Sequence, residues 1–324
     1  MKSDQFSSTN SNRLYQMIIP IVLVGLALFP FSEPPVYFIS FVFWIFLYVC
    51  LSSSWNLIGG YAGYLSFGHV AFFGIGAYAT AMLGKIFSLS VSLTLLAAIP
   101  AGLIASLIAI IVGYPCLRLR GPYFAVITLC FAFVSQLTVK NLEILGGADG
   151  LWLKTMDVSV EINRTIFYEL MLALTSVTVL VSFLVGRSKF GAGLRAIKED
   201  EEVAQTMAVN APRLKITAFA LSAFFPGVAG GIYACYLSYI HPDVVFDVNM
   251  SILQVLMALF GGASSWIGPV VGAVSLTVVN EGLSTFVKAE LARIIYGCLF
   301  IVVIVFMPNG ILEFFSRRTK RIDN

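Results

Sequence analysis

The stretch that decides the fold of this 324-residue chain reads NLIGGYAGYLSFGHVAFFGIGAYA and runs from Asn56 to Ala79. It is mostly apolar, yet six of its 24 residues are glycine. In water, a glycine inside a helix costs about 1 kcal/mol relative to alanine. In a bilayer the balance differs, because small residues allow neighbouring helices to approach closely. What these glycines do therefore depends on the solvent that surrounds the chain.

The composition identifies that solvent as lipid. Hydrophobic residues make up 59% of the chain and charged residues 11%, whereas soluble domains hold about 25% charged residues. A membrane-spanning helix needs about 20 mostly apolar residues. Apolar runs suited to crossing recur at residues 17–31, 36–58, 91–113, 166–186, 216–240 and 292–307. The sequence predicts an all-α, polytopic membrane helical bundle in the cytoplasmic membrane, in contact with membrane lipid.

The basic residues predict the topology, because Lys and Arg accumulate in cytoplasmic loops. Fourteen of the 20 lie in segments 1–16, 114–121, 187–215 and 316–324. The other six lie in segments 84–90, 140–165 and 284–293. With the larger group inside, both termini are cytoplasmic, and the chain divides into a tail at 1–16, a transmembrane domain at 17–315 and a basic tail at 316–324. The net charge of +3 then reflects topology and does not indicate a nucleic-acid partner.

The number of spans depends on one short segment. Between the predicted external loops near 241–250 and 284–292 lie about 34 residues, which make about 51 Å of helix. Two crossings of a hydrocarbon core about 30 Å thick need more than this. Segment 252–283 is therefore expected to enter and return as shortened or broken helices around GGASSWIGP. The prediction is eight to ten transmembrane segments, including broken or re-entrant glycine-rich helices.

The glycine-rich segments suggest a translocation pathway. Broken helices at membrane depth occur where they are buried in protein or line a watery cavity, and transporters place substrate sites at such breaks. The predicted helix breaks are Gly59, Gly60, Gly68, Gly261, Gly262 and Gly268. The predicted pathway residues are Asn56, Ser66, His69, Thr128 and Gln136. The alternative is that the glycines only pack and the polar side chains only form hydrogen bonds between helices.

The chain shows no energy source of its own. Proton-coupled carriers use intramembrane acids or histidines, and we identify only His69 well inside an apolar run, where a structural hydrogen-bonding role is the simpler interpretation. The nucleotide-binding pattern GxxxxGK[ST] has no match. The five cysteines are scattered without metal-ligand spacing, and no His/Glu pairing or acidic dyad indicates an intramembrane enzyme. We expect no catalytic residue, no metal and no cofactor.

The longest predicted internal loop, RSKFGAGLRAIKEDEEVAQTMAVNAPRLK at 187–215, is also the most charged. Its apolar residues fall near one face of a helix that is expected to stop near Asn210 and Pro212; they are Leu194, Ile197, Ala204, Met207 and Ala208. Such a helix is either a solvated connector or a segment that binds in a groove on another protein.

Several blocks together resemble a known family. LSFGHVAFFGIGAY, LRLRGPYFAVITLCFA, LGGADGL, GLRAIKEDEEVAQTMAVN and LMALFGGASSWIGPVVGA are similar, in order and spacing, to the M-type permease subunit of ABC importers for branched-chain amino acids. The resemblance implies a permease domain that moves its solute by alternating access. The implied partners are a homologous second permease, two ABC ATPase subunits and an external solute-binding protein.

The resemblance makes loop 187–215 the element that couples the permease to the ATPases. The residues expected to carry this coupling are Arg195, Lys198, Glu199, Asp200 and Glu201. Three positions depart from the family pattern: Ala208 replaces a usual glycine, and Pro122 and Pro226 are expected to alter kinks. A urea permease of the same superfamily and a stand-alone channel or sodium-coupled carrier remain the alternatives.

Overall fold

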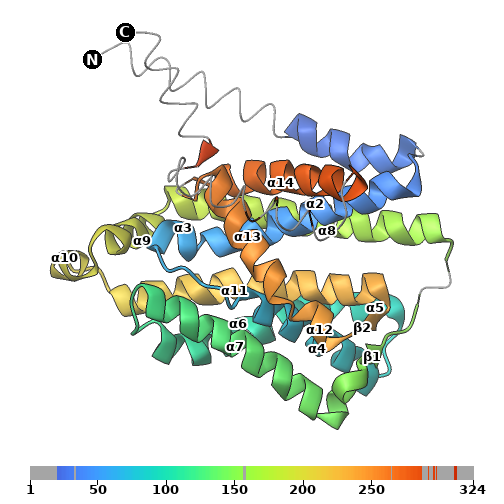
Figure 1. Ribbon diagram of the computed structural model, residues 1–324, viewed down its shortest axis with the longest axis horizontal. Coiled ribbons are helices and arrows are strands. Elements are labelled where there is room, and N and C mark those ends of the chain that lie inside the picture. The colour runs from blue at the N-terminus through green and yellow to red at the C-terminus, as the bar shows by residue number, and fades with distance from the viewer. Residues whose placement is uncertain are drawn as a thin grey trace, which may run out of the picture.

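The computed structural model describes residues 20–32, 34–155, 158–263 and 265–286, together with residues 291, 295, 297, 310 and 311. Most long helices run along one common direction, and the short elements lie at the two ends of the bundle (Figure 1). After a helix over residues 20–28, the elements are η1 (Phe29–Ser32), α2 (Val36–Asn56), α3 (Gly59–Ala62), α4 (His69–Ile86), α5 (Val91–Leu96), α6 (Ala98–Cys116), α7 (Pro122–Asn141), η2 (Glu143–Leu145), η3 (Gly147–Asp149), β1 (Leu151–Trp152), α8 (Val160–Arg187), α9 (Lys189–Glu199), α10 (Glu201–Thr206), α11 (Ala211–Leu237), β2 (Tyr239–Ile240), α12 (Pro242–Val245), α13 (Val248–Gly261) and α14 (Gly268–Phe286).

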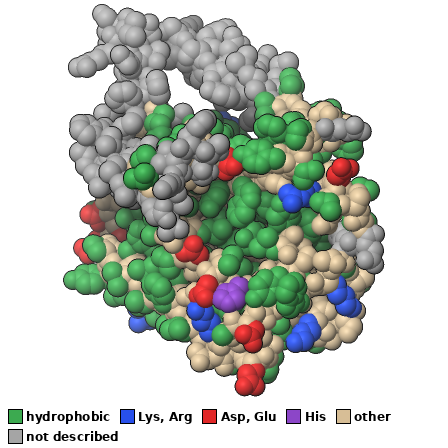
Figure 2. All heavy atoms as spheres, turned by 45° about the vertical axis from the view of Figure 1, so that its right-hand side comes forward, with side chains coloured by type: hydrophobic (Ala, Val, Ile, Leu, Met, Phe, Trp, Pro, Cys, Tyr) green, Lys and Arg blue, Asp and Glu red, His purple; other side chains and the backbone are tan. Residues whose placement is uncertain are grey.

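The described helices confirm the predicted membrane bundle. Six stretches are long and apolar enough to cross a membrane: Val36–Ala62, Val91–Cys116, Pro122–Asn141, Val160–Arg187, Ala211–Leu237 and Pro242–Gly261. Hydrophobic side chains cover much of the described face in Figure 2, where charged side chains are fewer. Most of the apolar run at 292–307 and the predicted tails at 1–16 and 316–324 lie outside the described residues.

Helix α11 lies at the centre of the bundle, where it packs against α6, α4, α2 and α8. Glycine permits this packing: a Cβ atom at Gly76 of α4 would lie 1.9 Å from the carbonyl oxygen of Gly227 in α11. The backbones of these two helices therefore touch directly, as small residues allow in membranes. Pro226 does not interrupt α11, which is helical from Ala211 to Leu237. Pro122 is the first residue of α7, a position where proline fits a helix without kinking it.

The glycine-rich stretch quoted at the outset contains a break in the helical path. Helix α3 ends at Gly63, whose φ of 77° is left-handed, and residues 63–68 are not helical. Gly59 and Gly60 lie inside α3, whereas Gly68 directly precedes α4. We call residues 63–68 the first break.

A second interruption separates α13 from α14. Helix α13 holds 14 residues and ends at Gly261, so its length of about 21 Å is shorter than a hydrocarbon core of about 30 Å. Helix α14 begins at Gly268. We call residues 262–267 the second break. Helix α14 holds 19 residues up to Phe286. The interruption therefore lies where it was expected, around GGASSWIGP, but only α13 is clearly shortened.

The two ends of the bundle differ in construction (Figure 1). At one end, Arg120 approaches Glu201 and Glu202, so segments 114–121 and 187–215 meet there. At the opposite end, β1 pairs antiparallel with β2, and Lys140 forms an ion pair with Asp243. Of the loops that the structure describes, 114–121 and 187–215 thus lie at one end and segment 140–165 at the other, the division that the count of basic residues predicted for these three.

Loop 187–215 does not form the single amphipathic helix that was expected. The helix breaks at Asp200, which is extended and separates α9 from α10. Of the residues expected to share one apolar face, Leu194, Ile197 and Ala204 are buried, but Met207 is 76% exposed. Ala208 is also exposed, with a left-handed φ of 62° that glycine adopts more readily.

Candidate functional site

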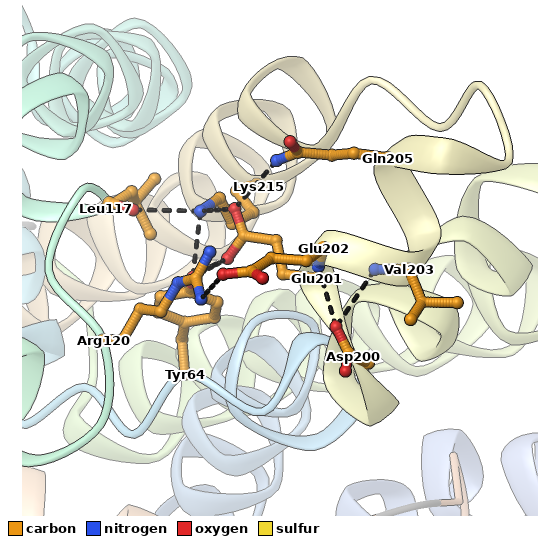
Figure 3. A network of polar contacts seen from close by, with 9 residues as sticks. All are labelled: Tyr64, Leu117, Arg120, Asp200, Glu201, Glu202, Val203, Gln205 and Lys215. Carbon is orange, nitrogen blue, oxygen red and sulfur yellow. Dashed lines mark hydrogen bonds and ion pairs between the residues drawn. The ribbon is translucent and has the colours of Figure 1, made fainter.

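A buried lysine is the centre of the polar cluster at the loop end (Figure 3). Lys215 lies near the start of α11, and its side chain is only 6% exposed. Its ammonium carries three hydrogen-bond donors, and it donates to Glu201 Oε1 at 2.6 Å, the Tyr64 hydroxyl at 2.9 Å and the Leu117 carbonyl at 3.0 Å. The buried charge is therefore both paired and fully hydrogen-bonded, as burial requires.

Glu201 is the acidic partner in this cluster. Its second oxygen accepts a hydrogen bond from the Tyr64 hydroxyl at 2.9 Å, and Arg120 Nε lies 3.4 Å away. Burial opposes ionisation of Glu201, but the hydrogen bonds from Lys215 and Tyr64 and the positive charges of Lys215 and Arg120 outweigh it and hold its pKa below the usual range. We call Tyr64, Glu201 and Lys215 the clasp.

The clasp joins segments that are distant in the chain. Tyr64 belongs to the first break, Glu201 begins α10, Lys215 belongs to α11, and Leu117 follows the last residue of α6. A second contact lies nearby, where Lys198 Nζ donates to the carbonyl oxygen of Gly60 at 3.0 Å. Between the loop and the bundle lies an open groove of about 400 Å³, with α3 and Tyr64 on one side and residues 197–202 on the other.

The structure gives the five predicted coupling residues different tasks. Glu201 belongs to the clasp, and Lys198 donates a hydrogen bond to the Gly60 carbonyl in α3. Arg195 donates to the carbonyl oxygen of Gly186 at 2.8 Å, which closes the turn between α8 and α9. Glu199 is exposed.

Asp200 acts on its own helix. Its Oδ1 accepts hydrogen bonds from the backbone nitrogens of Glu202 at 2.8 Å and Val203 at 3.1 Å. These bonds cap the N-terminus of α10, the position at which aspartate is among the best residues.

Side chains from three helices satisfy the backbone of the first break. Trp55 Nε1 donates to the carbonyl oxygen of Ser66 at 2.8 Å. The Thr128 hydroxyl accepts from Phe67 N at 3.2 Å, and the Ser251 hydroxyl donates to Phe67 O at 2.7 Å. Non-helical backbone at membrane depth needs such partners, because lipid offers none.

His69 begins α4 directly after the first break, and both of its ring nitrogens have partners. Nδ1 lies 3.0 Å from the Ser66 hydroxyl and Nε2 lies 3.1 Å from the Ser222 hydroxyl. Ser222 donates its own hydrogen to the carbonyl oxygen of Phe219 at 2.8 Å, so its oxygen accepts from His69. The Ser222 contact therefore places a proton on Nε2 of His69.

Four of the five predicted pathway residues come together near the first break. Asn56, Ser66, His69 and Thr128 are all buried, and Asn56 Nδ2 reaches the second break by donating to the carbonyl oxygen of Ser265 at 2.9 Å. Gln136 lies at the opposite end, where it donates to Asp243 Oδ1 at 2.8 Å. The structure therefore separates Gln136 from the other four.

Comparison with known proteins assigns the chain to a family. Residues 37–304 match the family model described as branched-chain amino acid transport system, permease component. The chain belongs to this family. The permease is 28% identical over 293 residues to the high-affinity branched-chain amino acid transport system permease protein LivM of Escherichia coli (strain K12), a match covering 82% of this chain and 68% of the relative.

Two further relatives extend the comparison. The permease is 23% identical over 316 residues to the probable branched-chain amino acid transport permease protein LivM of Methanocaldococcus jannaschii, covering 83% of this chain and 91% of the relative. It is 28% identical over 141 residues to the high-affinity permease protein LivH of Salmonella typhimurium, covering 44% of each chain. No solved structure matches the permease significantly.

Sequence reasoning missed three residues of the permease's loop-end cluster: Tyr64, Arg120 and Lys215. Lys215 stands just before an apolar run, where the count of basic residues explained it as a loop charge. Tyr64 and Glu201 are 137 positions apart, so no periodicity connects them. The one usable signal was a cation at the edge of an apolar run with acidic residues in the preceding loop.

Proposed function

We propose that this permease is the M-type, membrane-spanning subunit of an ATP-driven importer of branched-chain amino acids. The family match and the LivM relatives support the substrate class and the subunit type. The shorter match to LivH supports a homologous second permease as its partner. Two ABC ATPases and an external solute-binding protein complete the proposed transporter.

In this proposal the end that carries the clasp faces the cytoplasm. The two loops at this end, 114–121 and 187–215, contribute eight of the 14 basic residues in the predicted inside group. Lys and Arg accumulate on the cytoplasmic side of membrane proteins. The end with β1 and β2 then faces outward, where the binding protein would deliver the solute.

The outer face of α10 is the observation that carries the proposed coupling. Val203 in α10 and Met207, which directly follows the helix, are 58% and 76% exposed. They lie at the end of the bundle proposed to face the cytoplasm. Glu199 and Glu202, close to them in the chain, are exposed as well, and Glu202 pairs with Arg120. Exposed apolar side chains mark protein interaction sites where they gather, and exposed Glu199 would suit a basic residue on the ATPase.

Transport then requires the bundle to alternate between two conformations. We assign Asn56, Ser66, His69 and Thr128 to the solute pathway of the open states, with Gln136 at its outer mouth. Their burial is consistent with a closed conformation, in which polar groups of the pathway form hydrogen bonds with one another.

Purification with partners is the experiment that tests the function. The permease is extracted gently from its native membrane, and mass spectrometry identifies what stays bound. We expect two ABC ATPases and a second permease, and ATP-dependent uptake of leucine rather than urea by the reconstituted complex. Passive or sodium-driven uptake by the chain alone would instead support a channel or carrier.

A second experiment tests the docking face directly. Changing Val203 and Met207 together to aspartate is expected to release the ATPases while the bundle stays folded, because neither side chain is buried. Glu199→Lys is expected to weaken the same contact. Asp200→Asn is the matched control, because asparagine retains the cap of α10. ATPases that remain bound to the double variant would contradict this docking face.

A further inference from the structure

The clasp connects the proposed docking loop to the first break. We infer that Tyr64, Glu201 and Lys215 form the connection through which movement of α10 reaches the broken span, so that their loss uncouples ATP hydrolysis from transport. This inference rests on the proposed function and adds to it three positioning residues.

Tyr64 is held from two sides by one hydroxyl group. The hydroxyl accepts a hydrogen bond from Lys215 at 2.9 Å and donates one to Glu201 at 2.9 Å. The Lys215 ammonium also lies over the Tyr64 ring, 5.0 Å from its centroid. Displacement of α10 relative to the first break must break the bond to Glu201 or carry Tyr64 along.

Burial favours a movement that carries Tyr64 along with α10 over one that breaks its bond to Glu201. The side chains of Lys215 and Glu201 are 6% and 10% exposed, so a broken bond would leave a largely buried charge with fewer partners. A charge left without its partner at such a site is costly. The clasp therefore moves as one body with α10 and the start of α11.

The first break passes this movement to the membrane-depth residues. Four residues separate Tyr64 from His69, which begins α4, and the chain between them is not helical. Ser251 of α13 holds Phe67 in this stretch. Lys198 provides a parallel contact from α9 to Gly60. A shift at Tyr64 thus reaches both α4 and α13, the helices that border the predicted pathway.

The test measures transport and hydrolysis together. The complete transporter, with its ATPases and binding protein, is reconstituted into liposomes, and leucine taken up per ATP hydrolysed is recorded. Tyr64→Phe removes only the bridging hydroxyl, and it is expected to keep hydrolysis while lowering this ratio at least about 5-fold, the lower range of typical coupling between sites. Glu201→Gln is also expected to lower the amount of leucine taken up per ATP hydrolysed.

The matched control removes a comparable hydroxyl elsewhere. Tyr168 is buried in the half of α8 remote from the loop, and its hydroxyl donates to the carbonyl oxygen of Leu26 at 2.8 Å. Tyr168→Phe is expected to leave the ratio unchanged. A wild-type ratio in Tyr64→Phe would overturn the inference, whereas no ATP-dependent uptake by the unaltered complex would overturn the proposed function instead.

A measurement on the unaltered transporter keeps the inference testable if Tyr64→Phe does not assemble. Hydrogen exchange is compared between the ATP-free complex and a complex trapped with ATP. Residues 56–68 and 189–206 are expected to change protection together. A change confined to residues 189–206 would overturn the inference.

Discussion

The two breaks of this permease are both built on glycine, yet they are supported in different ways. The first break takes its hydrogen bonds from Trp55, Thr128 and Ser251 on three surrounding helices. In the second, Ser265 donates to the carbonyl oxygen of Gly262 at 3.2 Å and accepts from Gly268 N at 2.9 Å. The first break is thus held mainly by its neighbours, and the second largely by its own residues.

This difference indicates which break changes its conformation when the surrounding helices move. A segment held by separate helices changes when those helices shift, whereas a turn closed by its own side chain moves as a unit. The link between them is Asn56, which donates from the end of α2 to the carbonyl oxygen of Ser265. We therefore expect the first break to be the adjustable one.

The largest expected effect comes from removing the Lys215 ammonium, which pairs with Glu201 at the loop end. Lys215→Met leaves Glu201 in a buried position without its ammonium partner, and the expected loss is about 4 kcal/mol. The apparent melting temperature in detergent measures it. The double variant Lys215→Met, Glu201→Gln is expected to recover part of the loss, because no unpaired charge remains. Equal losses in both variants would contradict a buried ion pair.

The next effect tests the contact between α3 and the second break. A Cβ atom at Gly60 would lie 1.8 Å from Asn56 Oδ1 and 2.0 Å from the carbonyl oxygen of Ala263. Gly60→Ala is therefore expected to force α3 away from the second break and to cost about 3 kcal/mol. Gly282→Ala is the control, since no atom lies within 4 Å of the added carbon. Similar melting temperatures for the two variants would show that α3 does not touch the second break.

A smaller effect compares the two kinds of support directly. Ser251→Ala removes the donor to the partly buried Phe67 carbonyl, at an expected cost of about 2 kcal/mol. Ser265→Ala removes the local cap of α14, at an expected cost of about 1 kcal/mol. Hydrogen exchange is expected to rise over residues 63–69 in the first variant and over 265–271 in the second. Increased exchange across both breaks in either variant would contradict their separate support.

The sequence was sufficient to predict the membrane bundle and its glycine-rich interruptions. Apolar run length sets which segments cross, and glycine clusters mark where helices approach or end. Both signals are local, so a single sequence contains them. Helix α7 was not among the crossing-length runs, because polar residues such as Ser135 and Gln136 shorten its apolar stretch although the helix continues to Asn141.

The site was predictable only in part, for two physical reasons. Apolar spacing suggested one helix through 187–215, whereas Asp200 caps a new helix there. Spacing alone did not decide between one continuous helix and two helices separated at Asp200. The clasp depends on contacts between Tyr64, Glu201 and Lys215, which only the packing of α6, α10 and α11 brings together. The sequence could show that Asn56, Ser66 and His69 are polar residues within apolar segments. It could not show which groups they form hydrogen bonds with.

The smallest expected effect concerns pH and again separates the clasp from the local support of the second break. The pKa of Glu201 lies below its usual range, so its carboxylate stabilises the fold above the unfolded-state pKa of about 4.3, and this contribution disappears as pH falls through the lower folded-state value. Between about pH 6 and pH 8 the clasp is therefore expected to contribute a constant amount. Below about pH 4, the melting temperature of the unaltered protein should fall further than that of Glu201→Gln. The melting temperature of Ser265→Ala should fall as much as that of the unaltered protein, because no titrating group supports the second break's cap. A clasp contribution that already declines between about pH 8 and pH 6 would mean that Glu201 is not ionised in the folded permease.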